Sequence, residues 1–127
     1  MVKYFSQEFF AELQDKLSND AKWQQDTKGL KISMRLGSTD QNSAQNYLIK
    51  VEEGKTVISP SDATAQAEFS FEGTYDTWTK VAKGEVDLQS AVLKGLLKFK
   101  GSITKILSYK DRFARMAEVM RSIPVEF

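Results

Sequence analysis

Acid–base chemistry in this chain would depend on carboxylates, lysines and tyrosines, because its 127 residues include neither histidine nor cysteine. This composition excludes Ser-His and Cys-His nucleophilic pairs, thiolate or imidazole metal sites, and disulfides. Glu52 and Glu53 are adjacent on a strand end and therefore point to opposite faces. Glu68 and Glu72 share the polar face of another strand with Ser70. The sequence therefore offers no convergent carboxylate pair, and it predicts no catalytic residues, no metal and no cofactor.

A glycine-bounded run, LKGLLKFKGSITKI at residues 93–106, is the second candidate for chemistry. A phosphate-binding loop needs Gly-Lys-Ser/Thr, whereas this run has Lys100 before Gly101, the reverse order. Single-stranded nucleic acid would need aromatic and basic side chains on one face. Because Phe99 alternates with Lys98 and Lys100, the aromatic ring and the charges lie on opposite faces. We therefore expect no nucleotide site and no nucleic-acid partner, and we interpret residues 97–100 as a half-buried strand.

Positive charge is concentrated in the C-terminal third, although the formal net charge of the whole chain is only +1. Residues 94–121 contain eight lysines and arginines but only Asp111 and Glu118 as acids. Such an asymmetry indicates either a solvated helix face or an anionic partner near this region.

The first half of the chain predicts one helix followed by a three-stranded antiparallel meander. Phe5, Phe9, Leu13 and Leu17 recur every four residues, which is typical of an amphipathic helix. Alternation of apolar and polar residues then indicates strands. The expected elements are a helix at 4–18, an exit loop at 19–29 containing Trp23, strands at 30–36, 47–51 and 55–59, a polar turn at 37–46, a tight turn at Glu53-Gly54 and a strand end at Pro60.

The second half predicts two further strands and several short helices. Thr74, Asp87 and Ser102 are placed to cap helices, since their side-chain oxygens can accept a backbone N–H of the first turn. The expected elements are strands at 67–72 and 97–100, a helix from Thr74 to Gly84, a helix after Asp87, and a C-terminal helix that ends before Pro124. The C-terminal helix is either one long helix or broken at a second cap, Ser108.

Each expected strand has only one apolar face, and each helix has one apolar stripe. Helices must therefore cover one face of the sheet and leave the other polar and wet. The covering residues are rich in Phe, Trp and Met, and such a set fits either a filled core or the lining of a cavity.

Residues 74–107 resemble the sterol-carrier-protein domain family of non-specific lipid-binding proteins. The resemblance is carried by Thr77-Trp78 and by KGEVDLQSAVLKGLLKFKGSITKIL, with the strand LKFKG and the helix after it in the same order. Ser102 stands where the family often has aspartate, and both residue types can cap a helix. The preceding helix and meander agree in order, so the resemblance implies a single domain over residues 1–127.

The resemblance implies an α+β fold with a five-stranded, mostly antiparallel sheet and about five helices covering one face. An apolar cavity between the layers would hold a fatty acid, acyl chain, sterol or similar lipid without catalysis. The implied lining residues are Phe69, Phe71, Trp78, Val92, Leu93, Leu97, Phe99, Ile106, Phe113, Met116 and Met120.

Three further expectations concern partners and location. The C-terminal helix, with Met116 and Met120, would act as a lid, and Arg112, Arg115 or Lys105 would meet an anionic head group. A lipid carrier would contact a membrane surface transiently. The absence of a signal peptide, a membrane span and cysteine favours a cytoplasmic protein. The alternative is a structural or interaction module of the same fold with a filled core.

Overall fold

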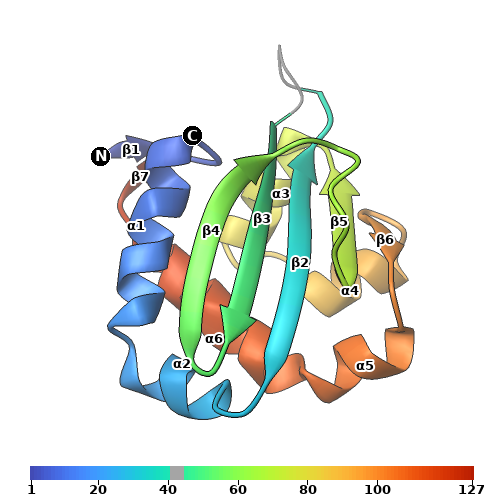
Figure 1. The fold of residues 1–127 in the computed structure, drawn as a ribbon. Helices are drawn as coiled ribbons and strands as arrows, with labels where there is room; N and C mark the ends of the chain where they lie inside the picture. The colour runs from blue at the N-terminus through green and yellow to red at the C-terminus, as the bar shows by residue number, and fades with distance from the viewer. Residues whose placement is uncertain (41–44) are drawn as a thin grey trace.

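The computed structural model describes residues 1–40 and 45–127, and within them helices and strands form two layers (Figure 1). The strands are β1 (Val2–Lys3), β2 (Lys31–Ser38), β3 (Gln45–Glu52), β4 (Lys55–Ser61), β5 (Phe69–Gly73), β6 (Lys98–Lys100) and β7 (Val125–Glu126). The helices are α1 (Gln7–Ser18), α2 (Ala21–Asp26), α3 (Tyr75–Ala82), α4 (Leu88–Leu93), α5 (Ile103–Ser108) and α6 (Lys110–Arg121).

The main sheet has five strands in the described residues, in the order β4-β3-β2-β5-β6. Strands β2, β3 and β4 form the expected antiparallel meander, and β6 is antiparallel to β5. The β2–β5 pair is parallel, so the sheet is mixed but mostly antiparallel, as predicted. The tight turn is confirmed at Glu53 and Gly54, whose φ angles of 53° and 78° are left-handed. A two-stranded parallel pair of β1 with β7 was not predicted.

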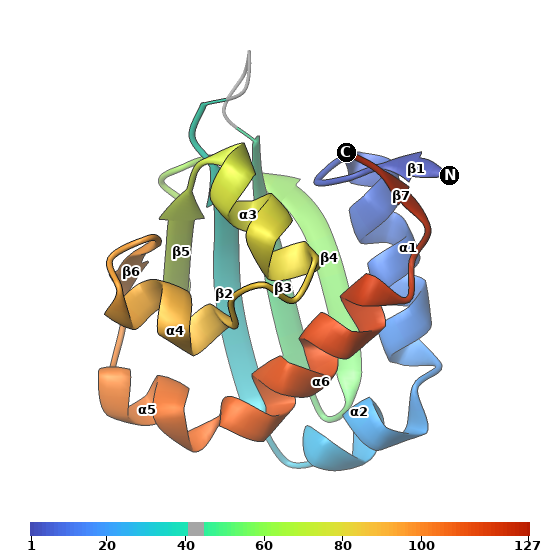
Figure 2. The ribbon, with the colours of Figure 1, turned by 180° about the vertical axis from the view of Figure 1, so that it is seen from behind.

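One face of the sheet carries the apolar residues and is covered by the helices. Ile32, Met34 and Leu36 alternate along β2 and are at most 2% exposed. The view from behind shows α3, α4 and α6 in front of this face and α5 at its lower left edge (Figure 2). The prediction of a one-sided helical layer is therefore confirmed.

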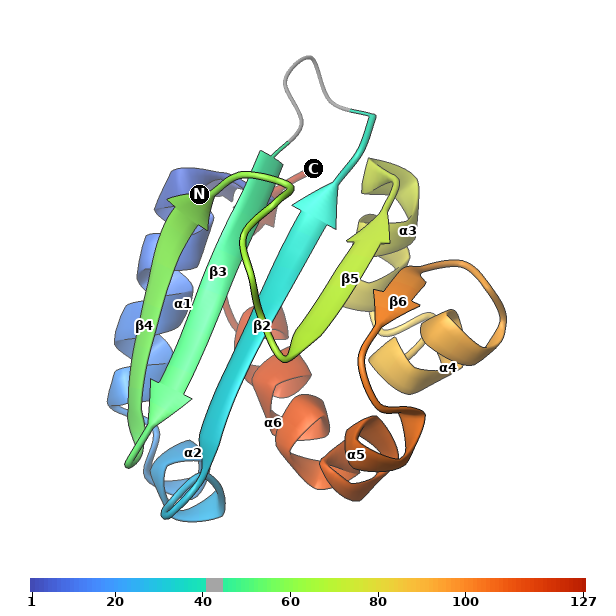
Figure 3. The same cartoon turned by 45° about the vertical axis from the view of Figure 1, so that its right-hand side comes forward.

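The opposite face is less open than expected. The β4–β5 connection passes in front of β2 (Figure 3), and the backbone N–H of Glu68 donates a hydrogen bond of 2.8 Å to Ser33 Oγ. Arg35 on this face is only 3% exposed. Its guanidinium donates to Asn46 Oδ1 at 2.6 Å and to Glu72 Oε1 at 2.6 Å. The expectation of a wholly wet face is thus wrong around Arg35, whose charge is neutralised by hydrogen bonds across three strands.

The predicted exit loop at 19–29 is wrong, because it contains the six-residue helix α2. Asp20 caps this helix by accepting the backbone N–H of Trp23 at 2.8 Å. Trp23 is fully buried, and its indole N–H donates to Thr56 Oγ1 at 2.8 Å. A helix of fewer than two turns shows too little periodicity to be recognised from sequence.

Several other boundaries shift. The first helix begins at Gln7 instead of residue 4, because Ser6 is its N-cap and Phe5 has a left-handed φ of 57°. Strand β4 continues through Pro60, which an edge strand tolerates because its missing N–H is not needed for pairing. Residues 37–38 and 45–46 of the expected polar turn belong to strands, and residues 41–44 lie outside the described residues.

The helix caps at Thr74, Asp87 and Ser102 are confirmed. Of the two possibilities for the C-terminal helix, one long helix or a broken one, the structure has the broken one, interrupted at Tyr109 to give α5 and α6. The expected cap at Ser108 is wrong, because its hydroxyl donates instead to the carbonyl oxygen of Lys105 at 2.7 Å. Tyr109 makes no side-chain cap.

Candidate apolar binding site

An apolar void lies between the sheet and the helices, where β2, α3, α4 and α6 meet. Its volume is about 10 Å³, room for roughly one water molecule. The residues that line it are Leu36, Trp78, Val81, Leu88, Phe113, Met116, Ala117 and Met120. The void lies between the sheet and the helices and is apolar, but it is far smaller than a tunnel for a hydrocarbon chain.

Four of the predicted lining residues reach this void, and they come from α3 and α6: Trp78, Phe113, Met116 and Met120. Trp78 is 1% exposed, and its indole N–H is satisfied by the carbonyl oxygen of Gly37 at 2.8 Å. The tryptophan therefore presents only its apolar surface to the void.

Sequence reasoning did not single out the other four lining residues. Leu36 belongs to the alternating apolar face of β2, so that alternation was an available signal. Ala117 lies one turn beyond Phe113 on α6, but a small half-buried alanine gives no hydrophobic signal of its own. Val81 and Leu88 are buried residues of short helices.

Phe69, Phe71 and Phe99 lie outside the void but adjoin its wall through Phe113. The ring centroid of Phe113 is 6.0 Å from that of Phe69 and 6.2 Å from that of Phe71. Phe99 in turn lies 5.2 Å from Phe71. These distances are typical of interacting aromatic pairs, so the rings form one continuous wall between β5, β6 and α6.

The remaining predicted lining residues differ in burial. Leu97 and Ile106 are each 2% exposed and belong to the core, and Val92 is half-buried against it. Leu93 is 65% exposed and faces solvent. Its prediction as a lining residue does not agree with this position, because α4 turns Leu88 and Ala91 inward and leaves its last residue on the outer side.

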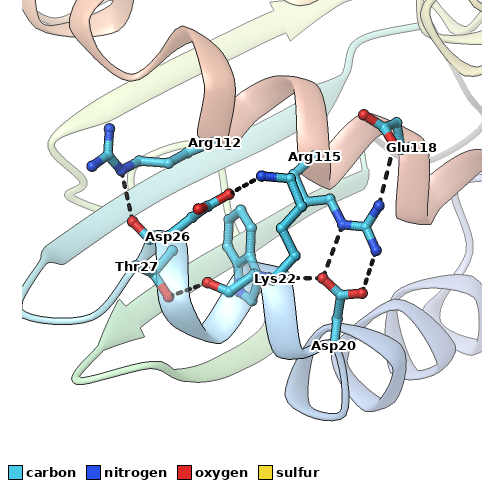
Figure 4. A network of polar contacts seen from close by, with 8 residues as sticks. Asp20, Lys22, Asp26, Thr27, Arg112, Arg115 and Glu118 are labelled. Atoms are coloured by element: carbon cyan, nitrogen blue, oxygen red, sulfur yellow. Dashed lines mark hydrogen bonds and ion pairs between the residues drawn. The ribbon is translucent and has the colours of Figure 1, made fainter.

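A network of polar contacts fixes α6 to α2 on the side away from α4 (Figure 4). Arg115 donates two hydrogen bonds to Asp20, of 2.9 Å and 2.5 Å, and a third of 3.2 Å to Glu118. The hydrogen bonds from Arg115 lower the pKa of Asp20 below its usual range. Arg112 donates to the carbonyl oxygen of Asp26 at 2.8 Å.

These contacts bear on the expected head-group residues. Arg112 and Arg115 are engaged with α2, and Lys105 forms an ion pair with Glu68. All three cations therefore already have partners within the chain. The same contacts make α6 a fixed wall on its α2 side, which argues against a lid formed by the whole helix.

A surface groove of about 380 Å³ runs between α6 and the α3–α4 connection. Val81 and Ala117 line both this groove and the apolar void. These two side chains therefore separate the groove from the void.

A larger hollow of about 550 Å³ lies on the opposite face of the sheet. Its lining includes Lys31, Lys50, Glu52 and Glu68. Charged side chains of both signs would remain poorly solvated against a hydrocarbon chain, so this hollow is a poor lipid site despite its size.

Two other kinds of site have no candidate among the described residues. In residues 1–40 and 45–127, no group of three or more acidic side chains is placed to hold a metal ion. Over the same residues, no helix combines the length and apolar character that crossing a bilayer requires.

A family model described as the SCP-2 sterol transfer family matches residues 10–114. The fold matches a crystal structure of sterol carrier protein 2 with a TM-score of 0.85 at 19% identity, covering 96% of this chain and 100% of that one. A solution structure of a conserved hypothetical protein from Thermus thermophilus matches with a TM-score of 0.86 at 19% identity, covering 99% and 93% of the two chains.

The same fold also occurs as a small part of a larger protein. A sec-alkyl sulfatase matches with a TM-score of 0.62 at 19% identity, over 81% of this chain but only 15% of the sulfatase. No curated protein sequence matches the chain. The TM-scores establish the shared α+β fold, and the family model establishes the family.

Proposed function

Because the chain belongs to the SCP-2 sterol transfer family, we propose that it carries a fatty acid, acyl chain or similar apolar ligand between its sheet and α3, α4 and α6. Family membership supports a lipid-binding or lipid-transfer role in general. The observation that carries the finer proposal is the apolar void, whose eight lining residues come from both layers. Under this proposal residues 1–127 act as a single cytoplasmic, non-catalytic domain.

The size of the void requires the layers to separate when a ligand binds. Ligand pockets commonly enclose about 300–1,000 Å³, whereas the void has about 10 Å³. Burial of about sixteen methylene groups would release on the order of 10 kcal/mol before ordering costs, which is enough to offset a local opening. Unbranched Met116 and Met120 can change rotamer to admit a chain.

We place the opening between α6 and the α3–α4 segment. On its other side α6 is held to α2 by Arg115 and Arg112, so separation there would break several charged hydrogen bonds. On the α3–α4 side the groove already approaches the void, and only Val81 and Ala117 intervene. The expected residues Phe69, Phe71 and Phe99 would meet the ligand if it extended along the aromatic wall past Phe113.

The alternative function is a structural module with a filled core, and the small size of the void favours it. The two functions differ in one property, since only a carrier takes up lipid.

A non-catalytic role is supported by the pairing of Glu68 with Lys105 and of Glu72 with Arg35. Loss of a measured turnover in Glu68→Gln would contradict that part of the proposal.

Native mass spectrometry of the protein purified from cells tests the proposal directly. A carrier is expected to retain a co-purified lipid and to bind a fluorescent fatty acid saturably. Failure to bind fatty acids of any chain length would leave the filled-core module.

The two tryptophans give a built-in test of location. Trp78 lines the void, whereas Trp23, a residue of α2, is buried against Thr56. A fatty acid with bromine on its chain should quench the fluorescence of the Trp23→Phe variant, which retains Trp78, and leave that of Trp78→Phe unchanged. Equal quenching of the two variants would place the ligand elsewhere.

Narrowing the proposed route is expected to weaken binding without unfolding the protein. Ala117→Leu adds a larger side chain between groove and void, and we expect at least a tenfold loss of fatty-acid affinity. Ala11→Leu on the exposed side of α1 is the matched control. Equal affinity in the two variants would contradict the route through Val81 and Ala117.

A further inference from the structure

The edge formed by α4, β6 and α5 exposes large apolar side chains. Leu93 is 65% exposed, Leu96 43%, Ile103 42% and Leu107 49%. We call these four residues the α4–α5 patch. They include more than half of the exposed large hydrophobic residues of the described chain, within only fifteen positions. In all three ribbon views α4, β6 and α5 lie together at one edge of the molecule (Figures 1, 2 and 3).

Helix α5 carries one apolar stripe, and core packing covers it only in part. Ile106 is 2% exposed and fills the inner side. Ile103 and Leu107, which flank Ile106 on the same face of the helix, nevertheless remain 42% and 49% exposed. The exit from α4 repeats this arrangement, because Leu97 is buried while the adjacent Leu96 is exposed. Clustered exposed apolar residues of this kind mark an interaction surface.

Positive charge lies along the same stretch of chain as the patch. Lys94, Lys98, Lys100 and Lys110 are all exposed. Within residues 1–40 and 45–127, none of the four forms an ion pair with a carboxylate. Asp111 is the one acidic residue between positions 93 and 112. The patch is therefore complementary to a surface of opposite charge.

We propose that the α4–α5 patch docks the protein on an anionic membrane surface, with the four apolar side chains inserted at the level of the head groups. Lysines are depleted in protein–protein interfaces. At a membrane, by contrast, long lysine side chains reach the anionic head groups while apolar neighbours enter the acyl boundary. The combination of protruding Leu and Ile with unpaired Lys thus favours a lipid surface over a protein partner.

Docking rests on residues different from those that line the void, so it is separable from the carrier function. It would hold α4 at the bilayer, beside the proposed opening between α6 and the α3–α4 segment. Under this proposal the α4–α5 patch is the surface through which the expected transient membrane contact occurs.

Co-sedimentation of the full chain with vesicles tests the docking. We expect binding to vesicles of equal parts phosphatidylserine and phosphatidylcholine, weak binding to phosphatidylcholine alone, and weakening as salt screens the lysines. The combined variant Leu96→Ser, Ile103→Ser, Leu107→Ser should lose at least tenfold in partitioning. Val57→Ser, which removes an apolar residue 44% exposed on β4, is the control and should bind as the unmodified protein does.

Charge reversal gives a second, independent measurement. Each lysine near an anionic surface contributes roughly a fivefold factor in partitioning, so Lys94→Glu with Lys110→Glu should lose more than tenfold. Lys16→Glu with Lys28→Glu, which changes exposed lysines of the α1–α2 region, should lose much less. Circular dichroism verifies that each variant is folded.

The possible outcomes separate docking from cargo binding. Folded patch variants that keep fatty-acid binding but lose vesicle binding support the proposal. Unchanged vesicle binding in both patch variants overturns it, as does a concentration-dependent dimer that depends on the patch in a protein that binds no vesicles. Fatty-acid binding without vesicle binding would overturn docking alone, and vesicle binding through the patch without fatty-acid binding would overturn the carrier function alone.

Discussion

The two ends of the helical layer are built differently. At the β4 edge, α1 and α2 are joined to the sheet by specific hydrogen bonds: Gln14 Oε1 accepts the backbone N–H of Ile58 at 2.7 Å, and Trp23 donates to Thr56. At the β6 edge, α4 and α5 expose leucine and isoleucine. Directional hydrogen bonds fix the position of a helix on the sheet, whereas partly exposed apolar side chains are held less specifically and can contact another molecule. The β4 edge therefore acts as a scaffold, whereas the β6 edge carries the proposed docking surface and the void lies against the central strand β2.

Aromatic packing strengthens the contrast. Near the β4 edge the ring of Phe9 lies 5.1 Å from both Tyr4 and Phe10, and Phe10 stacks on Tyr47 at 4.1 Å. At the void, the lining from α6 is one phenylalanine, two methionines and an alanine. Aromatic rings have few rotamers and fixed pair geometries, while methionine adapts to irregular space. Substitutions in the two regions should therefore have different consequences.

The largest expected effect is at the scaffold. Phe9→Ala removes a fully buried ring and should lower the free energy of unfolding by about 3–5 kcal/mol. Urea unfolding measures this loss. At temperatures where the variant remains folded, its fatty-acid affinity should equal that of the unmodified protein, since Phe9 is not itself one of the lining residues. A tenfold loss of affinity in the folded variant would contradict the claim that the β4 edge contributes to stability but not to ligand binding.

The ion pair between α2 and α6 gives a smaller, pH-dependent effect. Asp20 both caps α2 and accepts two hydrogen bonds from Arg115. Because its pKa is lowered in the folded protein, its contribution is present above the unfolded-state pKa of about 3.9 and is lost as the pH falls through the lower folded-state value.

Substitutions at Asp20 separate the cap from the charge. Asp20→Ala loses both and should lower the free energy of unfolding by about 1–3 kcal/mol at neutral pH. Asp20→Asn retains an equivalent cap, so we expect a smaller loss and a flatter stability profile in acid. Thermal unfolding between neutral and acidic pH measures both. An Asp20→Asn profile as steep as that of the unmodified protein would show that other groups dominate acid unfolding.

Tyr4 should contribute about 0.5–1.5 kcal/mol through the hydrogen bond of 2.8 Å that its hydroxyl donates to the carbonyl oxygen of Trp78. Tyr4→Phe removes only this hydroxyl, and chemical unfolding measures the cost. Burial raises the pKa of Tyr4. Its contribution is therefore complete below about pH 10 and is lost as the pH rises toward the folded-state value. The Tyr4→Phe variant should accordingly lose less stability in alkali than the unmodified protein.

Alternation and capping made much of the fold predictable. The register of Ile32, Met34 and Leu36 set the inner face of β2, and Thr74, Asp87 and Ser102 marked three helix starts. These features are local, so they can be recognised without knowledge of the tertiary contacts. Helix α2 was not predicted, because its six residues span too few turns for a periodic signal.

The candidate site was less predictable, because the residues that line the void are determined by how the helices pack across the sheet. Met116 and Ala117 both line the void, but only the methionine has a side chain that suggests it. Positions 93 and 97 are both leucine, yet Leu93 is 65% exposed and Leu97 is 2% exposed. The volume of the void depends on the fit between layers, a property with no period along the chain.

The last prediction concerns the methionines themselves, where the expected change is in ligand range, and it tests most directly whether the wall must adapt. Met116→Leu with Met120→Leu conserves volume closely, so each change should cost less than about 1.5 kcal/mol. Leucine is branched and fits irregular space less well. If the layers open around ligands of different shape, the double variant should bind a narrower range of fatty-acid lengths, as titration of a chain-length series would measure. Leu13→Met with Leu17→Met on α1, which adds the same flexibility to the scaffold, should leave that range unchanged. An equally broad range in the Met→Leu variant would mean that admission of a ligand depends on movement of α4 and not on the pliability of α6.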